Sequence, residues 1–96
     1  MHIREFQQLI KDMYWHKDSK RSVEANFIYL VEEVGELGSA IVKGDRALIE
    51  DELADALAWL VSVATALSVD IEEVALRRYG SSCPRCGKNP CVCNRK

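Results

Sequence analysis

Residues 23–43 are the segment that most restricts how this chain can fold. Apolar side chains occur there on almost every side of a helix, and only an acidic strip interrupts them. A helix of that kind must be buried over most of its surface. A chain of 96 residues has only a small core, so one copy can hardly cover this helix alone. The segment therefore predicts that copies of the chain associate, as a homodimer or as a dimer of dimers.

Three other segments also have helical patterns. Apolar residues recur at helical spacing over about 2–17, and a second helical segment covers about 46–67. The sequence Asp70-Ile71-Glu72-Glu73 resembles a capping box and predicts a short last helix that ends near Tyr79-Gly80. No segment alternates like a strand. We therefore expect an all-α fold, an antiparallel four-helix bundle type, over residues 1–80. Its helix boundaries are marked by Ser22, Gly44 and Asp45.

Acidic residues gather on the two long helices. Glu32, Glu33 and Glu36 fall within an arc of about 100° on the first of them. Glu52 and Asp55, three residues apart, share a face of the other. The link between the two helices is short, so they should pack antiparallel and bring these carboxylates together.

Converging carboxylates repel one another, and burial makes their ionisation still less favourable. A hard divalent cation removes that conflict, and oxygen ligands suit Mg²⁺ or Mn²⁺. The alternative is a solvated acidic face, but Asp55 lies in an apolar stretch and no basic residue is one helical turn from these acids. A di-iron site would need histidine on these helices, and the chain has only His2 and His16. Gly35 and Gly38, beside the acids, suggest close approach of a helix or a ligand.

The paired motif resembles that of a known family. Glu32-Glu33-Val34-Gly35-Glu36-Leu37, followed after fourteen residues by Glu52-Leu53-Ala54-Asp55, is similar to the signature of the MazG-like, all-α nucleoside triphosphate pyrophosphohydrolases. The resemblance extends over about 5–79. It implies hydrolysis between the α and β phosphates, which gives a nucleoside monophosphate and pyrophosphate, and a house-cleaning role against noncanonical nucleotides.

The resemblance also implies roles for individual residues. Glu33, Glu36, Glu52 and Asp55 correspond to the magnesium ligands, and Glu32 either activates the attacking water or supports the ligands. Such enzymes bind phosphates with basic residues and the base with aromatic ones. The corresponding candidates here are Arg77, Arg78, Lys20, Arg21, Trp59 and Trp15. A structural role is the alternative for the arginines on the last helix and for both tryptophans.

Two other functions remain open at this point. Lys43-Gly44-Asp45-Arg46, followed by Leu48-Ile49-Glu50, also resembles the phosphoribosyl-ATP pyrophosphohydrolases of the same superfamily. A non-catalytic helical adaptor that uses a zinc ribbon is the second alternative. An adaptor has no need of Asp55 opposite three glutamates, so the acids favour the enzyme.

The last segment, residues 81–96, contains every cysteine of the chain. Cys83, Cys86, Cys91 and Cys93 form two short cysteine turns, which predict a closed, structural zinc site with four thiolate ligands. A disulfide or redox pair and an iron–sulfur site are the alternatives. Binding of the metal would fold a tail that has almost no apolar residues of its own.

Charge and hydropathy exclude some other classes. The net charge of −2 is unlike that of a nucleic-acid-binding protein, although Lys88, Arg95 and Lys96 make the tail mildly basic. The longest apolar stretch, 56–69, is too short to span a bilayer, and no signal peptide is visible. We therefore expect a cytoplasmic protein that binds nucleotides and not membranes.

Overall fold

A computed structural model describes residues 1–94 and contains four helices. They are α1 (Ile3–Asp18), α2 (Val23–Lys43), α3 (Arg46–Ala66) and α4 (Ile71–Tyr79). The described residues contain no strand, so the predicted all-α fold is confirmed. Two residues of the predicted tail, Arg95 and Lys96, lie outside the described part of the chain.

Local sequence signals set the helix boundaries. The side chains of Ser22, Asp45 and Asp70 each accept a hydrogen bond from a backbone N–H in the first turn of α2, α3 and α4. These bonds satisfy N–H groups that have no partner within a helix. At Gly44, φ is 70°, a left-handed conformation that glycine adopts without steric cost, and its N–H bonds back to the Ala40 carbonyl. Gly44 and Asp45 thus end α2 and begin α3 within two residues.

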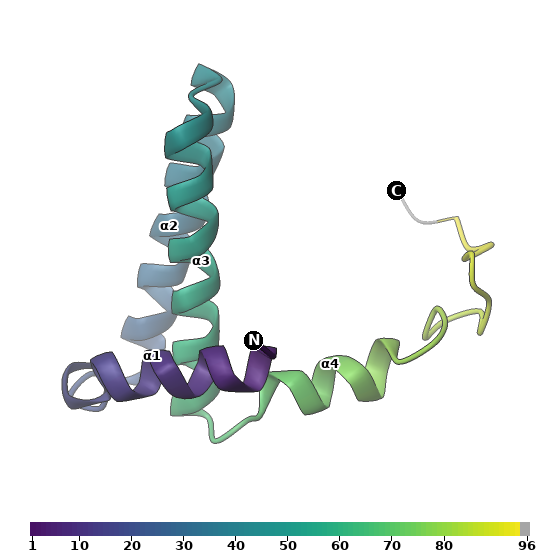
Figure 1. Cartoon of the computed structure of the whole chain (residues 1–96), viewed down its shortest axis with the longest axis horizontal. Coiled ribbons are helices and arrows are strands. Elements are labelled where there is room, and N and C mark those ends of the chain that lie inside the picture. Colours follow the sequence, from purple (N-terminus) through teal and green to yellow (C-terminus); the bar gives the residue numbers. More distant parts are fainter. Residues whose placement is uncertain (95–96) are drawn as a thin grey trace.

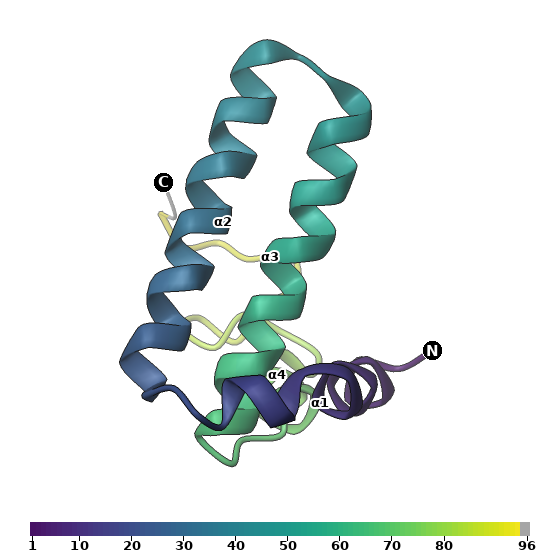
Figure 2. The ribbon, with the colours of Figure 1, turned by 90° about the vertical axis from the view of Figure 1, so that its left-hand side faces the viewer.

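Helices α2 and α3 pack side by side as an antiparallel hairpin (Figure 2). Helix α1 crosses the end of the hairpin opposite the Gly44 turn and contacts α3 (Figure 1). This crossing packs α1 against α3, and at the end of α1 the Asp18 carbonyl accepts a hydrogen bond from the Asn26 side chain of α2. The small apolar core forms there and along the hairpin, where Ile10, Ala40, Val61 and Ala64 are buried.

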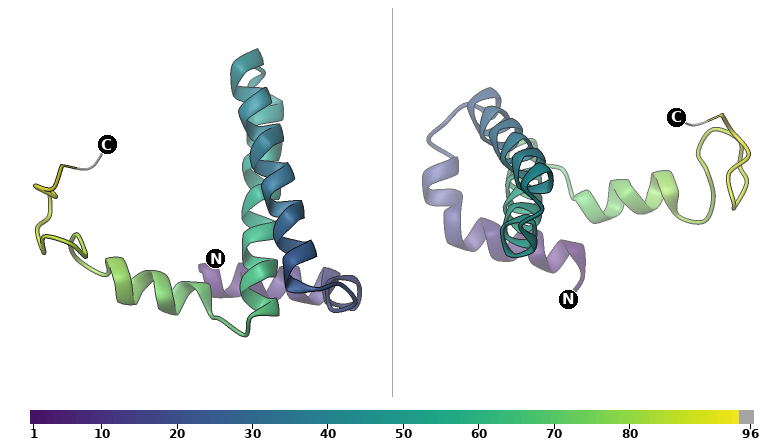
Figure 3. Two further views of the ribbon diagram at one scale, coloured as in Figure 1. Left: turned by 180° about the vertical axis from the view of Figure 1, so that it is seen from behind. Right: turned by 90° about the horizontal axis from the view of Figure 1, so that it is seen from above.

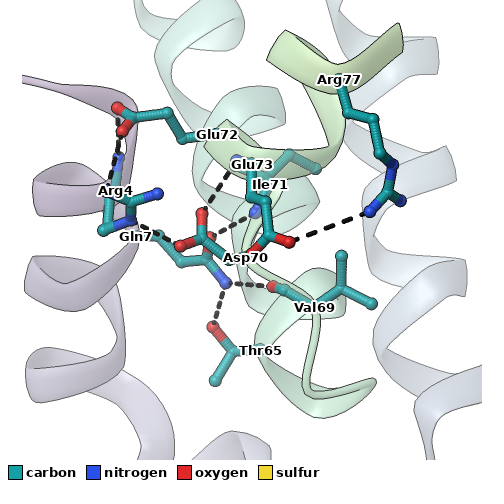
Figure 4. Close-up of polar contacts among 9 residues, drawn as sticks. All are labelled: Arg4, Gln7, Thr65, Val69, Asp70, Ile71, Glu72, Glu73 and Arg77. Atoms are coloured by element: carbon teal, nitrogen blue, oxygen red, sulfur yellow. Dashed lines mark hydrogen bonds and ion pairs between the residues drawn. The ribbon is translucent and has the colours of Figure 1, made fainter.

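Polar contacts from α1 hold the junction between α3 and α4 (Figure 4). The Gln7 amide donates to the Val69 carbonyl at 2.8 Å and accepts from the Ile71 N–H at 3.0 Å. Arg4 contacts the Asp70 carboxylate at 2.5 Å and the Glu72 carboxylate at 3.2 Å. One amide thus satisfies backbone groups on both sides of the turn, and it ties α1 to the start of α4 that the Asp70 cap marks.

Helix α4 projects away from the hairpin (Figure 3), and this makes the protomer an open structure. The Cα radius of gyration is 15.6 Å, whereas a compact domain of this length would have about 12–13 Å. No single helix of residues 1–94 is long and apolar enough to cross a membrane. Helices α3 and α4 together meet the length and composition required, but they are bent by 99° at their junction.

Gly35 and Gly38 do not have the close neighbour that the sequence suggested. Both are exposed, and a Cβ atom added at either position would have no atom within 4 Å. The expected close approach of a helix is therefore not found among the described residues, because α3 packs on another side of α2, and close approach of a ligand stays a prediction.

Candidate active site

The hairpin places functional side chains of α2 and α3 opposite one another. Glu33 and Glu36 of α2 lie close to Glu52 of α3, and Tyr29 stacks on Trp59 nearer the crossing by α1. Because Tyr29 precedes Glu33 by four residues and Trp59 follows Asp55 by four, these positions repeat with the helical turn. The site therefore has a carboxylate end and an aromatic end along the same hairpin.

Three carboxylates converge at the first of these ends. One carboxylate oxygen from each of Glu33, Glu36 and Glu52 lies within 4.8 Å of the others. Asp55 lies outside this trio, but its side chain lines the adjoining cavity together with Glu33. Both Glu33 Oε2 and Glu52 Oε2 are buried without a hydrogen-bond partner among the described residues. Buried oxygens without a donor, at this spacing and of this type, fit a hard divalent cation.

The electrostatics of Glu33 agree with that donor set. Burial and the contact with Glu52 raise the pKa of the Glu33 carboxyl from 4.5 to about 7. Repulsion from Glu36 and Asp55 adds to the rise in pKa. Without positive charge nearby, the carboxylates therefore favour a protonated Glu33.

A cavity of about 450 Å³ extends from these acids to α1. Its lining combines carboxylates, aromatic rings, one lysine and one arginine, from three helices and the loop before α2: Ile10, Tyr14, Lys17, Asp18, Arg21, Tyr29, Glu33, Asp55, Ala58, Trp59 and Ser62. The Tyr29 and Trp59 ring centroids are 5.0 Å apart, which leaves no room for a third ring between them. An aromatic ligand would therefore stack on an open face of this pair.

Arg21 reaches this aromatic pair from the loop before α2. Its guanidinium carbon is 5.4 Å from the Tyr29 ring centroid and 5.7 Å from that of Trp59, within cation–π range. The same guanidinium donates to Asn26 and pairs with the Asp18 carboxylate. Asn26 and Asp18 are both buried, so Arg21 is held in position by groups that do not move freely.

The structure distributes the predicted substrate-binding residues over several places. Trp59 and Arg21 line the cavity. Trp15 is half-buried on α1 and Lys20 is exposed in the loop, and neither lines the cavity. Arg77 and Arg78 lie on α4, beside a different hollow formed with Tyr79 and Pro84. Glu32 is exposed on α2, outside both the carboxylate trio and the cavity lining.

Sequence reasoning missed several residues that line this cavity. Tyr29 could have been found, because it lies one turn before Glu33 on the same face of α2. Tyr14, Lys17 and Asp18 had no comparable signal. They reach the cavity only because α1 crosses the hairpin at that end (Figure 1).

The four cysteines form a second cluster beyond α4. Their sulfur atoms lie within 4.8 Å of one another, with Cys83 Sγ 3.9 Å from Cys93 Sγ and Cys86 Sγ 3.8 Å from Cys91 Sγ. Backbone N–H groups of Val92 and Lys88 lower the pKa of Cys86 to about 6, whereas the neighbouring thiols of Cys86 and Cys91 raise that of Cys93 to about 11. Four thiols this close cannot all ionise unless a cation compensates them.

Comparison with known proteins identifies the domain that carries the acidic site. The family model described as the MazG nucleotide pyrophosphohydrolase domain matches residues 21–86. This range includes both acidic motifs, the aromatic pair and the first two cysteines. No curated protein matches the chain.

The raised pKa of Glu33 predicts a stability that depends on pH in protein free of divalent metal. Between the ordinary pKa of 4.5 and about 7, the folded state keeps a proton that the unfolded state has lost. The free energy of unfolding should therefore fall as pH rises through this window. In EDTA, the Tm of the wild type should decrease more than that of Glu33→Gln as the pH is raised from 4.5 to about 7. Addition of Mg²⁺ should raise the wild-type Tm most above pH 7. Equal pH profiles for wild type and Glu33→Gln would contradict the assignment.

Proposed function

The chain belongs to the MazG nucleotide pyrophosphohydrolase family, and on that premise we propose that it hydrolyses nucleoside triphosphates to a nucleoside monophosphate and pyrophosphate. The observation that carries this proposal is the convergence of Glu33, Glu36 and Glu52 beside a cavity with an aromatic end. A carboxylate cluster alone is common on protein surfaces. A cluster with buried oxygens that lack donors, next to stacked rings, matches a ligand that has a polyphosphate and a base.

Glu33, Glu36, Glu52 and Asp55 are the residues we propose as ligands of Mg²⁺ or Mn²⁺. When bound there, the cation would neutralise phosphate charge and lower the pKa of water. The chain's own residues complete the site. The Tyr29–Trp59 pair offers a face for a base, Lys17 brings a positive charge to the cavity, and Ile10 and Ala58 help to exclude water. Glu32, next to Glu33 on the exposed flank of α2, remains our candidate for accepting the proton of the attacking water.

We also propose that the four-cysteine tail binds structural Zn²⁺. For ligands at about 2.3 Å from zinc, tetrahedral geometry places sulfur atoms about 3.8 Å apart. The Cys86–Cys91 and Cys83–Cys93 sulfur distances, 3.8 and 3.9 Å, agree with that spacing. Backbone N–H groups of Arg85 and Cys93 donate to the sulfurs of Cys83 and Cys91, as they would to thiolates. With four protein ligands, the site would be closed and would stabilise the tail instead of catalysing a reaction.

The exposed apolar surface supports a homodimer. Phe27, Val31, Val34 and Ile41 of α2 are each about half-exposed and follow one another at helical spacings of four, three and seven residues. Leu53, Leu57 and Leu60 form a similar stripe on α3, and Leu67, directly after the helix, continues it. A monomer rarely exposes so much contiguous apolar surface. In such a dimer Gly35 and Gly38 would allow close approach of a second helix, and Arg77 and Arg78 of α4 would be candidate phosphate contacts across the interface.

The catalytic proposal predicts pyrophosphate release that requires Mg²⁺. A panel of canonical and noncanonical nucleoside triphosphates, with phosphoribosyl-ATP included, should identify the substrate and test the house-cleaning role. Glu36→Gln and Asp55→Asn should each lower kcat/KM by at least about 100-fold, since even indirect supports of metal ligands cost 10–100-fold. Glu50→Gln, at an exposed acid of α3 outside the trio, is the matched control. Absence of turnover for every nucleotide would favour the adaptor, and full activity of Asp55→Asn would refute its role as a ligand.

The zinc proposal predicts about one zinc per chain in protein purified without added metal. Cys86→Ser should lose this zinc but keep Mg²⁺ binding. Glu36→Gln should lose Mg²⁺ binding but keep the zinc, because thiolates and carboxylates select different ions. Cobalt substitution should give the intense visible absorption of a tetrahedral thiolate site. Freshly reduced protein that contains no zinc and takes up no cobalt would exclude the site.

The dimer proposal predicts a particle of twice the chain mass of 10.9 kDa in light scattering coupled to size exclusion. The double variant Val31→Glu, Leu57→Glu should dissociate it, because a charge on each stripe would lose its hydration on association. Glu24→Lys, an exposed change in the first turn of α2, should leave the mass unchanged. A folded wild-type monomer at micromolar concentration would contradict the proposal.

A further inference from the structure

Arg21 is fixed along one edge of its guanidinium group. Its Nε donates to Asn26 Oδ1 at 2.8 Å, and its Nη2 donates to Asp18 Oδ1. Asn26 is 0% exposed and uses its Nδ2 to donate to the Asp18 carbonyl at 3.1 Å. A polar side chain buried this completely in a folded protein is stable only when its polar atoms are hydrogen-bonded. Here those bonds connect the end of α1, the loop and α2 to one guanidinium.

The other edge of the same guanidinium is free to bind a ligand. Nε and Nη2 point to one side of the planar fork, so Nη1 and the second hydrogen of Nη2 form a separate pair of parallel donors. No hydrogen bond among the described residues involves Nη1 of Arg21. Arg21 lines the cavity, and its side chain is 29% exposed. The cavity thus contains a pre-positioned, two-pronged donor.

The position of this guanidinium along the hairpin indicates that it would contact the base of a nucleotide and not its phosphates. From Glu36 to Tyr29 the helix rises by about 10 Å, and the Arg21 guanidinium lies beside the rings of Tyr29 and Trp59. The Asp18 carboxylate also neutralises much of the guanidinium charge. An arginine that is neutralised by Asp18 and lies beside the aromatic pair is poorly suited to bind phosphate, but its directional donors can still recognise an uncharged acceptor.

We propose that Arg21, positioned by Asn26 and Asp18, is a specificity-determining residue that selects bases with two adjacent hydrogen-bond acceptors, as 6-oxopurines have at O6 and N7. Adenine presents N7 beside an N6 amino donor, so the same fork would meet one acceptor and one donor. The base would lie on the open face of the Tyr29–Trp59 pair, with its acceptor edge toward Nη1 and Nη2. This inference rests on the proposed nucleotide pyrophosphohydrolase function.

Two pairs of nucleotides test the inference. GTP should exceed ATP in kcat/KM by about tenfold or more, since a bidentate arginine–guanine contact provides about 1–3 kcal/mol of discrimination. Replacement of GTP by 7-deaza-GTP, which lacks the N7 acceptor, should lower kcat/KM by about fivefold or more. Arg21→Lys keeps the charge but removes the fork, so it should bring the GTP-to-ATP ratio close to one. The loss of preference in Arg21→Lys should appear mainly in KM, because contacts to the base are equally strong in the ground state and in the transition state.

The positioning role of Asn26 has its own variant. Asn26→Leu has a similar volume but no hydrogen bonds, so it should reduce the GTP-to-ATP ratio as Arg21→Lys does while kcat for ATP stays nearly unchanged. If Asn26→Leu does not fold, Arg21→Lys still decides the question. Arg46→Ala, which removes an exposed cation at the far end of the hairpin, should keep the wild-type ratio.

Binding of the products separates this inference from the function on which it rests. Calorimetry with GMP and AMP, in the presence of Mg²⁺, requires no turnover. A clear preference for GMP that Arg21→Lys abolishes would support the role of Arg21 even if triphosphates were not hydrolysed. Hydrolysis of GTP and ATP at equal efficiency, or a wild-type preference in Arg21→Lys, would overturn the inference and leave the proposed function intact.

Discussion

The convergence of carboxylates across the α2–α3 hairpin is the constraint on which the rest of this structure depends. Glu33, Glu36 and Glu52 bring oxygens within 4.8 Å of one another, and burial together with these acidic neighbours raises the pKa of Glu33 to about 7. The helix register places these three side chains on facing sides of the hairpin. Gly44 ends α2 and Asp45 begins α3 immediately afterwards, so the hairpin register follows from two adjacent residues. Packing of the hairpin thus stabilises a site that electrostatics opposes until a cation is present.

The same helix register gives the site a carboxylate end and an aromatic end. Since α2 and α3 run antiparallel, successive turns place acids opposite acids and then Tyr29 opposite Trp59. Helix α1 closes the aromatic end and adds Tyr14 and Lys17 to the cavity. The buried bonds among Asp18, Arg21 and Asn26 join α1 to α2 at that point. An aromatic end tied by hydrogen bonds and a carboxylate end that favours a cation suit the two chemically different ends of the nucleotide that we propose as substrate.

The cysteine tail is folded by different interactions from those that fold the helical part. The helical part is folded by apolar packing and helix caps, whereas residues 81–94 contain few apolar side chains and bring four sulfur atoms together. Soft thiolates and hard carboxylates prefer different ions, so the two clusters would not compete for one metal. The apolar stripes on α2 and α3, together with a projecting α4, show that one protomer buries only part of its apolar surface (Figure 3).

The sequence by itself determined the local features of this protein. Helix periodicity and the caps at Ser22, Asp45 and Asp70 located all four helices, and i, i+3 spacing placed the acids on shared faces. Cysteine spacing located the tail cluster for the same reason, because short-range geometry depends on neighbouring residues. Only the tertiary structure decided that α1 crosses the hairpin and brings in Lys17 and Asp18, that Arg77 and Arg78 lie away from the cavity, and that Gly35 has no neighbour. Those outcomes depend on the crossing angles between helices, which result from the packing of many side chains. The periodicity of a single sequence does not reveal these angles.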